Sequence, residues 1–167
     1  MTPAADNKIL VMIPTYNEVD NVGLIISRIR ALDFKPDILF VDDNSPDGTG
    51  KLLDNLSQED FRLHVLHRPG KLGVGSAHLD GIAWAYEHGY DRLVTMDSDQ
   101  THSPEDIHQF LEKANDADIV IGSRFLEKNS LVGWSPYRKL MTYTGHFLTQ
   151  LLLRMPYDAT GAFRCYN

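Results

Sequence analysis

Short apolar runs alternate with helical patterns along most of the chain. The runs predict five strands, at residues 8–14, 37–43, 62–68, 92–99 and 118–124. Between them, recurring apolar positions predict helices at residues 21–31, 50–56, 75–88 and 104–114. Strands that alternate with helices are typical of an α/β fold, with a three-layer, mostly parallel sheet and helices on both faces. Ligands of such sheets bind beyond the carboxyl ends of the strands.

A further helical pattern covers residues 138–155. Its apolar residues, together with one threonine, recur at the spacing of one helix face: Leu140, Met141, Thr144, Phe147, Leu148, Leu151 and Leu152. Arg138, Lys139 and Arg154 flank these positions. Two interpretations stay open. The helix either packs its apolar face on the core, or lies at a bilayer surface and guides a lipid chain.

The composition indicates a single globular domain. A chain of 167 residues suits one domain with its own core. Cys165 is the only cysteine, which excludes an intrachain disulfide and favours a reducing compartment. The sequence has no run of about 18 apolar residues, and residues 1–8 lack a basic segment followed by an apolar one. We therefore expect a cytoplasmic protein.

Charge is unevenly distributed along the chain. The net charge of −7 argues against a general nucleic-acid binder. Residues 1–123 hold 10 Lys and Arg against 21 Asp and Glu, whereas residues 124–167 hold 6 against 2. The basic last part is either scattered over a solvated surface or forms a site for an anionic substrate or lipid head group.

Four of the five predicted strands end in polar residues, at 14–18, 42–49, 97–99 and 122–124. Each has a local explanation: "DNSPDGT" is a good turn sequence, and residues 99–103 could cap a helix. Together, however, these segments would meet at one edge of a parallel sheet. Unpaired buried carboxylates are costly, so we expect a ligand-binding site there.

The acidic pair after the fourth predicted strand points to a divalent cation. Residues i and i+2 of a strand point the same way, so Asp97 and Asp99 would present two carboxylates on one side. Carboxylates suit Mg²⁺ and Mn²⁺, and Mg²⁺ is usually held by one or two carboxylates plus substrate phosphates. Arg124, at the next predicted strand end, could bind the same phosphates.

Two common phosphate-binding loops are absent from the sequence. No GxxxxGK[ST] occurs, and "GVGSAH" at residues 73–78 lacks the third glycine of GxGxxG. A nucleotidyltransferase also has an α/β sheet with acidic strand ends. It usually carries a Gly- and Lys-rich N-terminal loop, which "IPTYNE" is not. These classes of protein are therefore disfavoured.

Six motifs cover nearly the whole chain: "IPTYNE" (Ile13–Glu18), "VDDNSPDGT" (Val41–Thr49), "KLGVGSAHLDGIAWA" (Lys71–Ala85), "MDSDQTHSP" (Met96–Pro104), "GSRF" (Gly122–Phe125) and "DATGAFRCYN" (Asp158–Asn167). In this order they resemble the inverting family-2 glycosyltransferases, and among them the catalytic domain of the dolichyl-phosphate (polyprenyl-phosphate) mannosyltransferases. The resemblance implies a GT-A fold, like that of nucleotide-diphospho-sugar transferases, in one domain over residues 1–167. It also implies mannose transfer with inversion from GDP-mannose to a polyprenyl (dolichyl-type) phosphate, with Mg²⁺ or Mn²⁺, in peripheral contact with the cytoplasmic face of a membrane.

The resemblance assigns the nucleoside end of the donor to the first two motifs. It implies that Pro14, Tyr16 and Glu18 line the nucleoside pocket. Asp43 would hydrogen-bond the base, with Asp42 beside it.

The resemblance assigns the diphosphate end to the later motifs. Gly73 and Gly75 would let the backbone approach the nucleotide, because glycine has no Cβ. Asp97, with Ser98 beside it, would face the ribose and the metal. The catalytic residues that act on the phosphates would be Asp97, Asp99, Arg124 and Arg138.

Two departures from the family pattern concern the metal and the acceptor. The expected metal ligands are Asp97, Asp99 and Thr101, although the family carries glutamine where this chain has Thr101. Gln100 comes one place early, so a water could replace the third protein ligand. Related enzymes continue past "TGAFRCYN", and we therefore expect a domain truncated on its acceptor side.

Alternative functions stay open at this stage. The donor could be a UDP-sugar such as UDP-glucose, since side-chain identity alone does not resolve a sugar pocket. The chain could also be a nucleotide-sugar-binding module without turnover that needs a partner subunit. An acceptor phosphate is already anionic at neutral pH, so transfer to it needs no strong general base.

Overall fold

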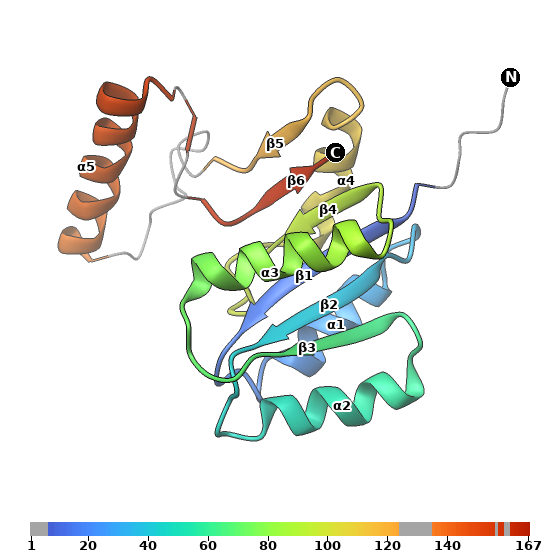
Figure 1. Cartoon of the computed structure of the whole chain (residues 1–167). Coiled ribbons are helices and arrows are strands. Elements are labelled where there is room, and N and C mark those ends of the chain that lie inside the picture. The colour runs from blue at the N-terminus through green and yellow to red at the C-terminus, as the bar shows by residue number, and fades with distance from the viewer. Residues whose placement is uncertain (1–6, 124–134, 156, 159–160) are drawn as a thin grey trace, which may run out of the picture.

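One six-stranded sheet organises the molecule (Figure 1). The structure, a computed structural model, describes residues 7–123, 135–155, 157–158 and 161–167. Its strands are β1 (Ile9–Thr15), β2 (Asp37–Asp42), β3 (Leu63–His67), β4 (Arg92–Thr95), β5 (Ile119–Ile121) and β6 (Arg164–Tyr166). Their order is β3-β2-β1-β4-β6-β5. β1 to β4 pair in parallel, whereas β6 runs antiparallel to both β4 and β5.

Helices cover both faces of the sheet, which confirms the predicted three-layer α/β fold. They are α1 (Val22–Arg30), α2 (Thr49–Glu59), α3 (Val74–Glu87), the 3-10 turn η1 (Pro104–Asp106), α4 (Ile107–Lys113) and α5 (Pro136–Leu153). Val11 and Ile13 of β1 pack in one apolar cluster with α1, α2 and α4. Leu10 and Met12 point to the other face and pack against α3.

A glycine sets how closely α3 lies on the sheet. A Cβ atom at Gly81 would come within 2.8 Å of Met12 Cγ, closer than van der Waals contact allows. The small residue therefore lets the middle of α3 lie directly on β1.

One predicted strand was too long, and one strand was missed. The fourth strand was expected to reach Asp99, but β4 ends at Thr95 because Asp97 donates its N–H to the side chain of His102 and not to a neighbouring strand. The short strand β6 was not predicted. Its three residues are too few to show a period of two, and its place beside β4 is set by tertiary pairing.

The predicted helix at 138–155 is confirmed as α5, which lies to the side of the sheet (Figure 1). Its apolar residues are exposed, so the interpretation of a helix that packs them on the core is wrong: Leu140, Met141, Phe147, Leu148, Leu151 and Leu152 are 44–71% exposed. Among the described residues, no helix is both long and apolar enough to cross a bilayer.

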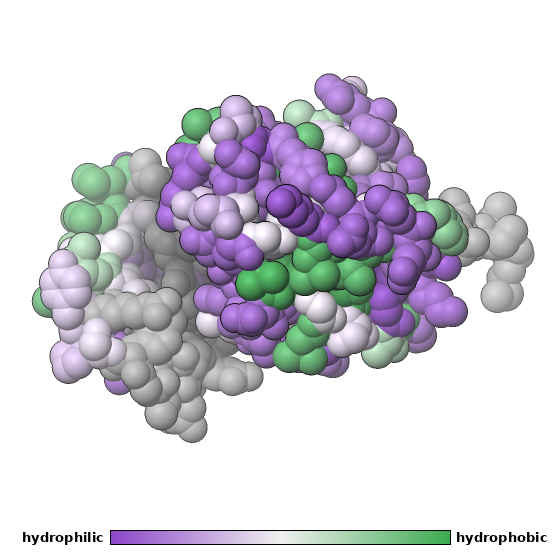
Figure 2. All heavy atoms as spheres, turned by 90° about the horizontal axis from the view of Figure 1, so that it is seen from below, coloured by the Kyte–Doolittle hydropathy of each residue, from purple (hydrophilic) through white to green (hydrophobic). Residues whose placement is uncertain are grey.

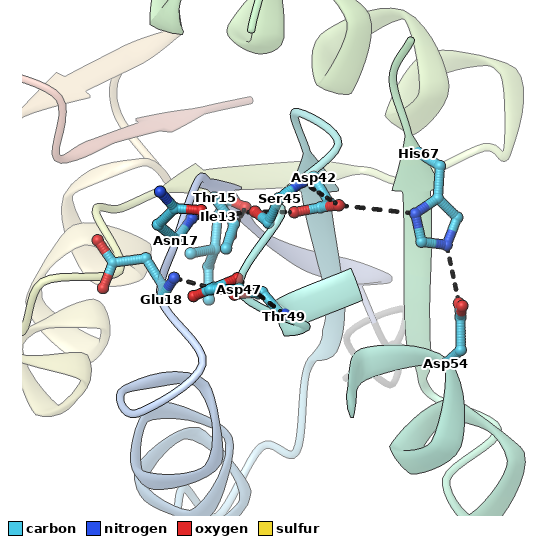
Figure 3. A network of polar contacts seen from close by, with 10 residues as sticks. All are labelled: Ile13, Thr15, Asn17, Glu18, Asp42, Ser45, Asp47, Thr49, Asp54 and His67. Atoms are coloured by element: carbon cyan, nitrogen blue, oxygen red, sulfur yellow. Dashed lines mark hydrogen bonds and ion pairs between the residues drawn. The ribbon is translucent and has the colours of Figure 1, made fainter. Parts of the chain in front are cut away.

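The loops after β1 and β2 are braced against each other (Figure 3). The backbone N–H of Asn17 donates to Ser45 Oγ at 3.0 Å, and that of Glu18 donates to Thr49 Oγ1 at 3.0 Å. Asn17 has a φ of 60°, a left-handed conformation that the asparagine side chain tolerates better than most. The loop after β1 therefore takes its shape from the loop after β2.

Asp47 is the centre of this brace. One carboxylate oxygen, Oδ2, accepts from Val19 N–H at 3.2 Å, while Oδ1 accepts from the N–H and hydroxyl of Thr49 at 3.0 and 2.6 Å. Desolvation opposes ionisation, but these hydrogen bonds outweigh it and hold the pKa of Asp47 below its ordinary value of 3.8.

We predict that Asp47→Asn lowers the free energy of unfolding near pH 7 by about 0.5–1 kcal/mol, a small value because the residue is exposed. Because the folded-state pKa is depressed, the ionised group stabilises the fold above pH 4 and loses this effect as the pH falls through its pKa. Urea denaturation from pH 7 to pH 3 should show a shallower acid loss for the variant than for the unmodified chain.

Asp20→Asn is the matched control, since Asp20 is an exposed acid of the facing loop, the one after β1. It should leave both the stability and its pH dependence nearly unchanged. Equal effects of the two variants would contradict the role given to Asp47.

Candidate functional site

A cleft of about 280 Å³ opens at the carboxyl ends of β1, β2 and β4, beside the start of α3. This is the edge of the sheet where the sequence predicts a ligand site. The residues that line it are Pro14, Thr15, Tyr16, Glu18, Asp43, Lys71, Gly73, Val74, Ala77, Asp97, Ser98 and Asp99.

Eight predicted site residues line this cleft, and they come from four separate segments: Pro14, Tyr16, Glu18, Asp43, Gly73, Asp97, Ser98 and Asp99. The parallel strands bring these segments together, because three of them follow strands whose carboxyl ends lie at the same edge. The sequence therefore located most of the cleft correctly.

Asp42 does not line the cleft, although it was predicted beside Asp43. It is buried, and its carboxylate accepts from the hydroxyl and the N–H of Ser45 at 2.5 and 3.2 Å. Its Oδ2 atom also lies 3.8 Å from His67 Nδ1, and His67 Nε2 lies 2.8 Å from Asp54 (Figure 3). Successive residues point to opposite sides here, so Asp43 faces the cleft while Asp42 holds the loop beneath it.

The remaining predicted residues are placed differently or lie outside the description. Gly75 is in the first turn of α3 but does not line the cleft. Thr101 is also outside the lining residues. Arg124 and the side chain of Arg138 lie outside the described residues.

The acidic stretch after β4 is a loop built around its own side chains. Asp99 Oδ1 accepts from the N–H and the hydroxyl of Thr101 at 3.1 and 2.6 Å. Asp97 donates its N–H to His102 Nδ1 at 3.0 Å, and the His102 ring stacks on Phe163. Asp97 and Asp99 thus reach the same cleft through this loop, and not through the alternation of a strand.

The donor set of the cleft fits a divalent cation that a substrate helps to bind. Asp97 and Asp99 both line the cleft, and the side chain of Asp97 is 38% exposed. In the part of the chain that is described, no three His, Cys, Asp or Glu side chains cluster as a complete metal site. Two carboxylates that line one cleft match the way Mg²⁺ is held together with phosphates.

A basic and an aromatic side chain also line the cleft. Lys71 Nζ lies 4.1 Å from the centre of the Tyr16 ring, a cation–π contact inside the cleft. Asp43 forms an ion pair at 2.9 Å with Arg68, whose side chain is buried behind it.

His78 lies on α3 near Asp97. Burial lowers the pKa of His78 below its ordinary value of 6.5, and the charge of Asp97 only partly opposes this.

Four lining residues were not singled out as site residues from the sequence: Thr15, Lys71, Val74 and Ala77. Three of them stand inside "KLGVGSAHLDGIAWA", so the motif itself was a signal, although only its glycines were assigned a role. Thr15 is the last residue of β1 and donates its hydroxyl to Ile13 O, a contact that no sequence pattern indicates.

Comparison with solved structures supports the fold. Mannosyl-3-phosphoglycerate synthase from Rubrobacter xylanophilus superimposes with a TM-score of 0.71 at 18% identity, and the match covers 96% of this chain and 53% of that one. At this identity the similarity indicates a shared GT-A fold and no more.

Comparison with known sequences gives the family. The model of glycosyl transferase family 2 matches residues 10–166. An undecaprenyl-phosphate mannosyltransferase of Micrococcus luteus is 41% identical, over 96% of this chain and 66% of the relative. A polyprenol monophosphomannose synthase of Mycolicibacterium smegmatis is 40% identical, over 95% of this chain and 61% of the relative. The chain thus spans just under two thirds of the length of these relatives, and it belongs to glycosyl transferase family 2.

Proposed function

We propose that the chain transfers mannose from GDP-mannose to a polyprenyl phosphate, with inversion at the anomeric carbon. One observation carries this proposal: a single cleft gathers Asp43 with Asp97 and Asp99. A nucleoside diphosphate needs a hydrogen-bond acceptor for its base at one end and a cation-binding pair for its phosphates at the other. The functions named for the two relatives support mannose as the sugar and a polyprenyl phosphate as the acceptor.

The nucleoside end of the donor would lie between the first two loops. Pro14, Tyr16 and Glu18 would contact the nucleoside, and Asp43 would accept from the base. Gly73, whose φ of 95° suits glycine, would let the backbone approach the nucleotide. The brace between the two loops keeps these groups in place before the donor binds, which reduces the entropy lost on binding.

The diphosphate end would lie at the loop after β4. Asp97 and Asp99 would hold Mg²⁺ or Mn²⁺, and the bound cation would supply the positive charge that stabilises the departing diphosphate. Thr101 fixes the orientation of Asp99 by donating to its Oδ1 atom. We propose phosphate contacts for Arg124 and Arg138, and keep Thr101 as a candidate third ligand.

The acceptor supplies its own nucleophile. An anionic phosphate oxygen would attack the anomeric carbon; the new C–O bond forms as the bond to GDP breaks, and GDP leaves with the electron pair. No proton has to be removed, so no general base is needed. His102 fits this picture as a support of the loop, because its Nδ1 atom accepts the N–H of Asp97.

Sugar transfer is the test of this proposal. With GDP-mannose, Mn²⁺ and a short polyprenyl phosphate, the chain should form mannosyl-phosphoryl-polyprenol. Asp99→Ala should lower the rate by about 10²-fold or more, since it removes a carboxylate from the cation site. The matched control Asp116→Ala removes an exposed acid outside the cleft and should leave the rate unchanged.

Other outcomes distinguish the alternatives. Transfer from UDP-glucose in place of GDP-mannose would contradict the proposed donor. Nucleotide binding without transfer to any acceptor would contradict the enzymatic function and support a binding module.

We also propose that α5 lies on a membrane surface near the acceptor. Figure 2 shows hydrophobic residues exposed on the side of the molecule formed by α5. Phe147 and Leu151, one turn apart, are 60% and 61% exposed. The sequence from residue 128 to residue 157 holds four Lys and Arg and no Asp or Glu, which favours an anionic lipid surface.

Vesicle co-sedimentation tests this placement. Leu151→Asp should weaken binding to vesicles that contain anionic phospholipid by about tenfold or more, because it removes buried apolar area and adds a negative charge. Gln150→Asp adds the same charge at an exposed polar position and should weaken binding much less. Equal losses for the two variants would indicate charge attraction alone, and an absence of vesicle binding would contradict the proposal.

A further inference from the structure

Arg68, the residue that follows β3, is a buried cation behind the cleft. Its side chain is 3% exposed, and its Nη1 atom lies 2.9 Å from Asp43 Oδ1. Its Nη2 atom donates to Ser76 Oγ at 2.5 Å, and its backbone N–H donates to Asp42 O at 2.8 Å. Arg68 therefore joins the end of β2 to the first turn of α3, the two segments that form one wall of the cleft.

Asp43 is held on both of its carboxylate oxygens. Arg68 pairs with Oδ1, and the backbone N–H of Leu72 donates to Oδ2 at 3.2 Å. The side chain is only 8% exposed, yet it lines the cleft. Each carboxylate oxygen has more than one acceptor site, so both can still accept a hydrogen bond from a ligand. The orientation of this acceptor is thus fixed by protein groups before any ligand arrives.

The second acidic partner of Arg68 differs from the first. Asp80 Oδ2 lies 3.1 Å from Arg68 Nε, but the Asp80 side chain is 50% exposed and does not line the cleft. An exposed pair contributes little to stability, whereas a buried carboxylate that loses its cation is left uncompensated. The buried contact to Asp43 is therefore the one whose loss changes the cleft.

We propose that Arg68 is a positioning residue that holds Asp43 as the acceptor for a ring N–H of the donor base, and so determines which bases bind. This inference rests on the proposed function, in which Asp43 contacts the base. Guanine offers N1–H and its 2-amino group to a carboxylate, and uracil offers N3–H. Adenine N1 and cytosine N3 present a lone pair at the same position and are repelled. A site built to accept such a hydrogen bond rejects the base that lacks it.

The test compares bases on a constant diphosphate. Calorimetry in Mn²⁺ measures nucleotide binding to four proteins: the unmodified chain, Arg68→Met, Asp43→Asn and the double variant. The favoured base is that of GDP or UDP, whichever has the lower Kd. The disfavoured bases are those of ADP and CDP. The Kd ratio between disfavoured and favoured base isolates the base contact, because phosphate and metal contacts cancel. We expect Arg68→Met to lower this ratio about tenfold, as does Asp43→Asn. The double variant should match Asp43→Asn, since Arg68 acts through Asp43.

Two further variants separate positioning from simple structural support. Asp80→Asn removes the exposed partner of Arg68 and should leave the ratio unchanged. Arg68→Lys keeps the charge but reaches fewer of the partners of Arg68, and should retain part of the ratio. If Arg68→Met does not fold, the double variant can still be used, because it removes both charges of the buried pair. Its Kd ratio is then compared with that of Asp43→Asn.

Three results would overturn the inference. Arg68→Met could lower the melting temperature and leave the Kd ratio unchanged, which would make Arg68 a structural residue only. The double variant could have a lower ratio than Asp43→Asn, which would mean that Arg68 does not act through Asp43. Failure of the unmodified chain to bind GDP or UDP would overturn the proposed function and this inference together, whereas the first two results leave the proposed function intact.

Discussion

Repulsion between acidic side chains at the carboxyl ends of parallel strands is the constraint on which this molecule depends. Glu18, Asp43, Asp97 and Asp99 share one cleft of about 280 Å³. Like charges that share a cleft disfavour each other unless cations lie close by. Arg68 compensates Asp43 from behind, at 2.9 Å. In our account Asp97 and Asp99 are compensated differently, by a divalent ion that binds together with the diphosphate of the donor.

The fold provides a rigid frame for these charges. β1 lies between β2 and β4, so the loops that follow all three strands meet at one edge of the sheet. Hydrogen bonds centred on Asp47 join the loops after β1 and β2, and so fix the wall of the cleft that these loops form. Asp97 and Asp99 lie on a loop that its own side chains support. α5 lies apart from this frame with its apolar residues exposed, which suits the role that we propose for it at a membrane surface.

The sequence predicted the parts of the molecule that repeat a local pattern. Apolar runs predicted β1, β2, β4 and β5, and an alternating pattern predicted β3; the polar residues after these strands predicted most of the cleft. It could not predict contacts between distant segments. β6 is short and depends on pairing with β4, and Arg68 gains its role only because folding buries it against Asp43. Asp42 and Asp43 look alike in sequence, but one supports a loop and the other faces the cleft.

In our interpretation the cation and the nucleotide bind as one unit, and thermodynamic linkage between them is the decisive test. Calorimetric titration of the chain with GDP in Mn²⁺ and in EDTA gives the coupling, and titration with Mn²⁺ in the presence and absence of GDP must give the same factor. We predict that Mn²⁺ tightens GDP binding by about tenfold or more, and that GDP tightens Mn²⁺ binding equally. Equal GDP affinity in Mn²⁺ and in EDTA would contradict the account.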